Sequence, residues 1–177
     1  MKVWIFGDSF AASRSKYSWT ALLSSKYDVV VYASNGSSQY RIWKAYKQVK
    51  DEIDPEDCVL FCHTSPYRVF LKNNSTILSR LLPSHPYCDI IINDIIEKKE
   101  SKFIKILRSI WDEEYFVDTH DLLLRDMDSP HCLHFTFFES ETLKSFHKVW
   151  QENKGGINHM SAKGNRIMFE KVAQWLG

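Results

Sequence analysis

Ser9 is the residue whose position in the sequence most directly suggests chemistry. It lies in the stretch Val-Trp-Ile-Phe-Gly-Asp-Ser-Phe, where an apolar run stops at a Gly-Asp-Ser turn. Such a serine is either the N-cap of a following helix or a nucleophile held at the end of a strand. A nucleophilic serine needs an imidazole that takes its proton and fixed donors for the oxyanion that forms. Ser9 alone does not decide between these two interpretations.

The elements around Ser9 alternate between strand and helix patterns. Strands are predicted at residues 2–6, 28–33 and 57–62, and helices at residues 18–27 and 38–53. Continuous apolar strands separated by helices predict a parallel sheet covered on both sides. The β-branched run at 28–33 has the length and composition of a strand buried on both faces.

Three loops should therefore meet at one edge of the sheet. They follow the three predicted strands and comprise residues 7–10, 34–38 and 63–68. Because ligands of parallel sheets bind beyond the carboxyl ends of the strands, this edge is the expected functional site.

The remainder of the chain is less regular. Residues 65–86 are expected to form a long excursion, and residues 87–126 to be mostly helical with a break between Lys99 and Lys102. The β-prone run at 131–138 predicts a fourth strand, whereas the pattern at 141–152 is ambiguous. A last helix is expected from an N-cap at Ser161. The apolar face of that helix comprises Met168, Val172, Trp175 and Leu176.

Composition limits the class of protein. The chain has 177 residues, of which 44% are hydrophobic and 25% are charged, as expected for one globular domain over residues 1–177. A formal net charge of +1 predicts neither nucleic-acid nor membrane-surface binding. The first strand leaves no room for a signal peptide, and no apolar run is long enough to span a bilayer. A cytoplasmic location is therefore expected, whereas the oligomeric state is unreadable from the sequence.

The four cysteines do not form a disulfide framework. Cys58, Cys62, Cys88 and Cys132 contain no CxxC pair, and the first two lie on one predicted strand. Their spacing on a strand is roughly 13 Å, which is beyond disulfide reach. Buried thiols in a reducing compartment are expected.

Three motifs in this order resemble the SGNH/GDSL hydrolase family. They are Gly-Asp-Ser-Phe at residues 7–10 after the first strand, Gly36 after the second, and Asn-His-Met-Ser-Ala-Lys-Gly-Asn at residues 158–165 before the last helix. Together these motifs span nearly the whole chain. The resemblance implies a three-layer α/β/α sandwich of the flavodoxin-like type around a mostly parallel sheet.

The resemblance also implies roles for individual residues. Ser9 would be the nucleophile and His159 its general base, and the backbone N–H groups of Ser9 and Gly36 would contribute to the oxyanion hole. The implied activity is that of a serine esterase or acylhydrolase. Its substrate would be an acyl or acetyl ester of a small molecule, a carbohydrate or a lipid, and the reaction needs no cofactor.

Two positions depart from the family pattern. The asparagine that usually follows the third strand as an oxyanion donor is absent, so that His63 or Thr64 would have to replace it. The aspartate that usually lies three residues before the histidine is replaced by Gly156. The backbone at Gly156 or the side chain of Asn158 would then orient His159, and a Ser–His dyad of lower activity is expected.

Several other residues have a structural and a functional interpretation. Asp8 would bind backbone donors of its own turn or contact substrate, and His63 would be either an oxyanion donor or a hydrogen-bonded wall residue. Arg68 would bind an anionic part of the substrate or form an ion pair in its loop. No metal site is predicted, because no carboxylate or cysteine spacing completes a ligand set with the histidines. The histidines considered are His131, His134 and His147.

Two other functions fit the same residues. One is acyl transfer to an acceptor other than water, with Arg68 and residues 65–86 excluding solvent. The other is a non-catalytic binding or assembly protein on a decayed hydrolase scaffold. The two departures favour the second alternative, whereas the retention of both Ser9 and His159 favours an enzyme.

Overall fold

The computed structural model describes residues 1–12, 15–65, 68–70, 89–91, 120–155 and 159–177. Five strands form one sheet in the order β2-β1-β3-β6-β7, and each neighbouring pair is parallel. The strands are β1 (Lys2–Gly7), β2 (Asp28–Ala33), β3 (Cys58–His63), β6 (Cys132–Thr136) and β7 (Lys144–Ser145). The parallel sheet predicted from the alternating pattern is therefore confirmed.

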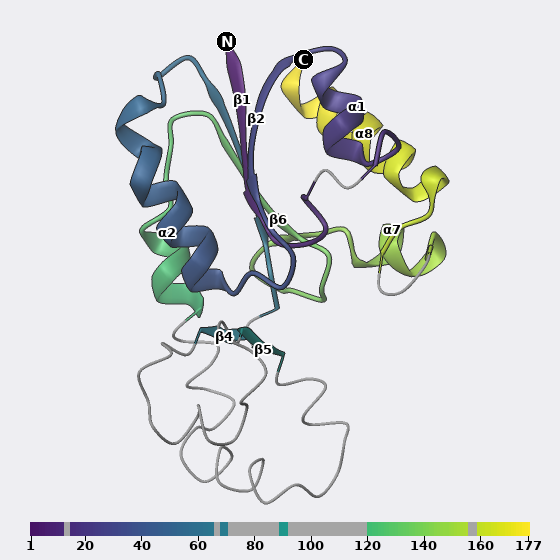
Figure 1. Cartoon of the computed structure of the whole chain (residues 1–177). Helices are drawn as coiled ribbons and strands as arrows, with labels where there is room; N and C mark the ends of the chain where they lie inside the picture. Colours follow the sequence, from purple (N-terminus) through teal and green to yellow (C-terminus); the bar gives the residue numbers. More distant parts are fainter. Residues whose placement is uncertain (13–14, 66–67, 71–88, 92–119, 156–158) are drawn as a thin grey trace, which may run out of the picture.

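Helices cover both faces of this sheet (Figure 1). On one face, α1 (Trp19–Ser24) packs beside α8 (Ala162–Leu176), and α7 (His147–Glu152) contacts α8. On the other face lie α2 (Gln39–Val49) and the helical residues 120–125. The layers are those of an α/β/α sandwich.

Serine side chains define the starts of the three main helices. Ser18, Ser38 and Ser161 each accept a hydrogen bond from the backbone N–H three residues later. The N-cap predicted at Ser161 is confirmed. The helices predicted from Ser18 and Ser38 begin one residue later, because those serines are caps with extended backbones. The helix predicted over 38–53 ends at Val49 and continues as a 3₁₀ turn, η1 (Lys50–Glu52).

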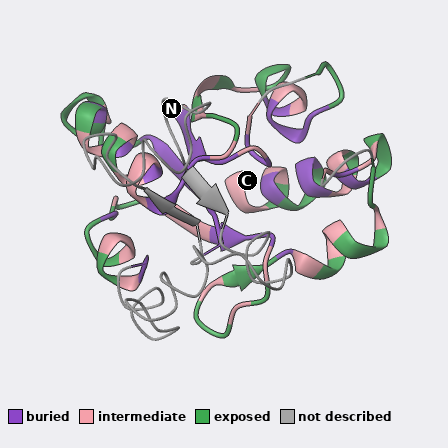
Figure 2. Cartoon of the chain, turned by 60° about the horizontal axis from the view of Figure 1, so that its bottom comes forward, coloured by how far each residue is buried: buried purple, intermediate pink, exposed green. Residues whose placement is uncertain are grey.

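The core consists of two apolar clusters, one on each face of the sheet. Figure 2 colours the buried residues purple along the ribbon. Alternate residues of β1 enter different clusters, so that Ile5 packs with Trp19 and Met168 while Phe6 packs with Ile42. Phe61, Phe135 and Phe137 are buried as expected, whereas Trp43 is only partly buried. Met168 and Val172 of the predicted apolar face of α8 are buried, and Trp175 and Leu176 are partly buried.

One strand differs from its predicted environment. The β-branched run Asp28–Ala33 predicts a strand buried on both faces, but no residue of β2 is buried. In the described sheet β2 is an edge strand that pairs with β1 alone, which explains the exposure. Val29 and Val31 pack against the apolar cluster on one face of the sheet, and Val30 packs against the cluster on the other face.

The regions with weak patterns contain short elements. The ambiguous residues 141–152 form β7 and α7. Residues 89–91, which the pattern includes in a mostly helical stretch, instead form strand β5 (Asp89–Ile91), antiparallel to β4 (Arg68–Phe70). Most of the long excursion and of the predicted helical stretch, residues 71–88 and 92–119, lies outside the described residues, and Cys88 lies there too. Cys58 and Cys62 are buried, and neither is in a disulfide.

A buried carboxylate anchors the beginning of the sheet. Asp57, which is 5% exposed, accepts hydrogen bonds from Lys2 N (2.7 Å), the Trp4 indole Nε1 (2.8 Å) and Asp54 N (3.4 Å). Burial by itself would raise the pKa of Asp57, but these N–H donors outweigh it and lower the pKa below 3.8. The stabilisation is therefore present above pH 3.8 and is lost as the pH falls below this value.

We expect Asp57→Ala to lower the free energy of unfolding by about 2–4 kcal/mol, because it leaves three N–H donors without their acceptor. Urea denaturation measures the loss. Asp51→Ala removes an exposed aspartate from η1 and should change stability by less than about 0.5 kcal/mol. Equal losses in the two variants would contradict the anchoring role of Asp57.

Candidate active site

Three of the elements that carry predicted site residues meet at the carboxyl ends of the strands. Ser34 N, after β2, donates to Gly7 O at the end of β1 (3.3 Å). The hydroxyl of Thr64, after β3, donates to Asp8 Oδ2 (3.0 Å). The structure therefore brings the loops after β1, β2 and β3 together at one edge.

Ser9 lies in a tight turn fixed by its neighbour Asp8. The Asp8 side chain is fully buried, and its Oδ1 accepts Phe10 N at 2.9 Å. The Asp8 carbonyl accepts both Ala11 N and Ala12 N at 3.1 Å. Ser9 itself is half-buried. Asp8 thus binds donors of its own turn, as its structural interpretation predicts, and its buried carboxylate also holds Thr64.

No helix begins at Ser9. Residues 9–12 form turns and a bend, and α1 starts later, at Trp19, with Ser18 as its N-cap. The N-cap interpretation of Ser9 is therefore wrong. Glycine is required at position 7, because the Cβ of any other residue would lie 2.7 Å from Ala11 Cβ and 2.9 Å from Cys62 Cβ and would clash with both.

Gly36 lies in the turn between β2 and α2 with a backbone that favours glycine. Its φ is +69°, and a Cβ would meet no atom within 4 Å. The requirement is therefore conformational and not steric. Ser34 Oγ and Ser37 Oγ, 2.8 Å apart, close this turn.

Thr64 is held from two directions. It is 1% exposed, its hydroxyl donates to Asp8, and its carbonyl accepts a hydrogen bond from His120 Nε2 at 3.1 Å. The proton of the hydroxyl therefore points to the Asp8 carboxylate.

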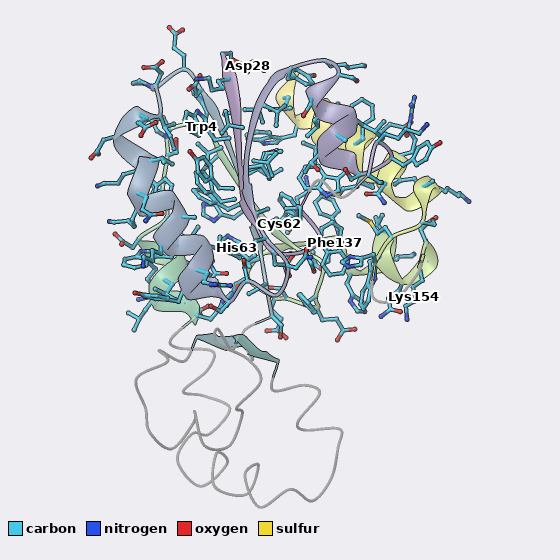
Figure 3. The ribbon with its side chains drawn as sticks, in the orientation of Figure 1. Trp4, Asp28, Cys62, His63, Phe137 and Lys154 are labelled. Atoms are coloured by element: carbon cyan, nitrogen blue, oxygen red, sulfur yellow. The ribbon has the colours of Figure 1, made fainter. Side chains whose placement is uncertain are left out.

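His63 belongs to a buried chain of polar side chains on the α2 side of the sheet (Figure 3). Its Nδ1 lies 2.9 Å from Gln39 Nε2, and its Nε2 lies 2.8 Å from His134 Nδ1. In the neutral ring one of these two nitrogens donates and the other accepts. Both ring nitrogens are used, which agrees with a hydrogen-bonded wall residue.

The three neighbouring histidines are neutral at neutral pH. Burial lowers the pKa of His63 well below 6.5, and the proximity of His134 and His120 lowers it further. Burial also lowers the pKa of His120 and of His134. A charge on any of them would be poorly solvated and close to another imidazole.

His159 lies on the segment that precedes α8, close to the Ser9 turn. Its ring is half-buried and lies 5.6 Å, between centroids, from the ring of Phe10. Its carbonyl accepts Gly155 N at 2.6 Å, and Lys154 and Met160 form an antiparallel bridge beside it. The segment is therefore held against residues 153–155.

Some predicted site residues lie outside these contacts. Gly156 and Asn158, the proposed orienters of His159, are outside the described residues. Arg68 is the first residue of β4, of which the backbone alone is described. In the described part of the chain, no group of three or more histidine, cysteine, aspartate and glutamate side chains is placed to hold a metal ion. His131 is exposed, and His147 Nδ1 lies 3.2 Å from Phe137 O.

Four residues at this edge have no counterpart in the sequence prediction. Gln39 and His120 contact His63 and Thr64, and Trp19 and Asn165 connect the turns of Ser9 and His159. The contacts of Gln39 with His63, of His120 with Thr64 and of Trp19 with Asn165 join distant parts of the chain, which local patterns do not reveal. The described helices include none with the length and apolar character needed to cross a membrane.

Comparisons with known proteins give structural similarity without sequence similarity. No family model and no curated protein matches the sequence. A lipolytic protein of the G-D-S-L family from Veillonella parvula aligns with 15% identity over 98% of this chain and 97% of its own, at a TM-score of 0.45. A protein assigned to the same family from Desulfitobacterium hafniense aligns with 14% identity over 98% of both chains, at a TM-score of 0.43. Similarity of this degree identifies neither an activity nor a substrate for this chain.

Acidification should destabilise the fold through the buried histidines. Folding lowers the pKa of these histidines below 6.5, so that below this pH the unfolded chain binds protons that the folded chain does not. The free energy of unfolding is therefore highest above pH 6.5 and decreases as the pH falls. We therefore expect urea midpoints to fall between about pH 7 and about pH 5.

The variant His134→Gln should flatten this dependence, because it removes one titrating ring and keeps an amide beside His63. His131→Gln, which removes an exposed histidine next to the same strand, is the matched control and should keep the wild-type slope. A slope that is the same in His134→Gln as in the wild type would exclude His134 as a contributor.

Proposed function

We propose that the chain is a serine esterase or acylhydrolase in which Ser9 forms an acyl-enzyme and His159 is the general base. The contact between the rings of Phe10 and His159 is the observation that carries this proposal. Phe10 directly follows Ser9, so this contact brings the segment of the base to the turn of the nucleophile. The motif resemblance described above supports the same pairing.

The reaction proceeds in two steps. Ser9 Oγ attacks the acyl carbon of an ester while His159 takes the hydroxyl proton, and the tetrahedral intermediate then expels the alcohol, which receives that proton. In the second step His159 takes a proton from water, whose oxygen attacks the acyl carbon. Release of the acid returns the proton to Ser9. No cofactor takes part in these steps.

The backbone N–H groups of Ser9 and Gly36 are the proposed oxyanion donors. Among the described residues, neither group has a hydrogen-bond partner, and the two turns are joined by the Ser34–Gly7 bond. Each such donor is worth about 3–4 kcal/mol in the transition state.

We leave His63 out of the oxyanion hole because both of its ring nitrogens have partners. The Thr64 hydroxyl would become a third donor only by releasing Asp8.

The substrate is proposed to be a small-molecule, carbohydrate or lipid ester with an acyl or acetyl group. Gly156 stands where the family pattern has an orienting aspartate. A Ser–His dyad of modest activity is expected for that reason, because an imidazole oriented without a carboxylate is a weaker base.

Hydrolysis of short-chain p-nitrophenyl esters tests the proposal. Ser9→Ala and His159→Ala should each lower kcat/KM by at least about 100-fold, because each removes a group that the first step requires. A fluorophosphonate probe should label Ser9 in the wild type, as peptide mass spectrometry would show.

Ser25→Ala and His131→Ala are matched controls with exposed side chains and should keep wild-type rates. Release of p-nitrophenol at the same rate from all variants, without labelling of Ser9, would overturn the proposal and favour a non-catalytic binding protein. An ester product formed with an added alcohol in place of the free acid would identify an acyltransferase.

A further inference from the structure

Three hydrogen bonds connect the residue after Ser9 with the residue after His159. The indole Nε1 of Trp19 donates to Phe10 O at 2.7 Å. The backbone N of Trp19 donates to Asn165 Oδ1 at 3.0 Å. Asn165 Nδ2 in turn donates to Met160 O at 3.2 Å. We call Trp19 and Asn165, with these bonds, the strut.

Trp19 suits this place because both of its N–H groups need acceptors. It is the first residue of α1, where a backbone N–H has no partner within the helix, and its side chain is fully buried. An indole N–H in such surroundings must be bonded or its desolvation remains uncompensated. Phe10 O and Asn165 Oδ1 satisfy the two groups.

Asn165 uses all the polar atoms of its side chain. Its Oδ1 accepts from Trp19 N, and its Nδ2 donates to Met160 O and to Ser161 O, at 3.2 and 3.1 Å. The amide therefore binds α1 on one side and the segment of His159 on the other. An aspartate of the same shape keeps the acceptor but has no protons for the two carbonyls.

We propose that Trp19 and Asn165 are positioning residues that set the distance between Ser9 and His159. This inference rests on the proposed function. Ser9 lies in a turn, and His159 lies in the segment before α8, which is bonded to residues 153–155 but not directly to the turn of Ser9 by any hydrogen bond described above. The strut bonds the turn of Ser9 and the segment of His159 to α1 and α8, which pack against each other. A misplacement of about 1 Å at such a pair lowers rates by as much as about 100-fold.

Trp19→Phe and Asn165→Asp test the two ends of the strut. The first removes the indole N–H and keeps most of the buried surface, and the second removes the two amide donors. We expect each to slow the labelling of Ser9 by a fluorophosphonate at least about 10-fold and to lower kcat more than it raises KM.

Two matched variants control for loss of stability and for the change of charge. Trp4→Phe removes a buried indole N–H, bonded to Asp57 at the opposite end of the sheet. Gln174→Glu adds a negative charge at an exposed position of α8, as Asn165→Asp does within the strut, and leaves the strut intact. Both controls should keep the wild-type labelling rate when urea denaturation shows that they are folded.

Combination with His159→Ala separates positioning from general destabilisation. If the strut acts by aligning Ser9 with His159, Trp19→Phe and Asn165→Asp should have no further effect once the imidazole is absent. An equal loss in both backgrounds would show a structural role alone and overturn the inference. Wild-type rates in both single variants would also overturn it while leaving the proposed function in place. A wild-type protein that is neither labelled nor active would overturn the proposed function and the positioning role together.

Discussion

The parallel pairing of β1 with both β2 and β3 is the constraint on which the rest of the structure depends. Gly7 pairs with Ala33 on one side and with Cys62 on the other, so three strands end at nearly the same level. Each strand is followed by a loop with polar or glycine residues, and hydrogen bonds join these loops to one another. The position of the candidate site is therefore determined by the register in which the three strands pair.

Polar groups at this edge are bonded mainly to one another. Asp8 and Thr64 join the first and third loops, and the buried chain of Gln39, His63 and His134 fills the space on the α2 side. These hydrogen bonds join side chains that belong to different loops and strands, and they hold the edge of the sheet together.

The parts of the fold that could be predicted from the sequence are those set by local pattern. The strands at Asp28–Ala33 and Cys58–His63 and the cap at Ser161 depend on neighbouring residues, and their types were sufficient. The edge position of β2 could not be predicted, because burial of a strand depends on the order of strands in the sheet. The contact of His120 with Thr64 spans 56 residues, and no local pattern indicates it.

The strut acts on the main chain at both ends, since it ends on the carbonyl oxygens of Phe10 and Met160. Every amino acid has such a carbonyl. The side chains at these two positions are fixed by other contacts, because Phe10 stacks on Phe137 and Met160 is buried in the same apolar cluster. A substitution at residue 10 or 160 therefore keeps the carbonyl acceptor of the strut and changes the apolar packing around it.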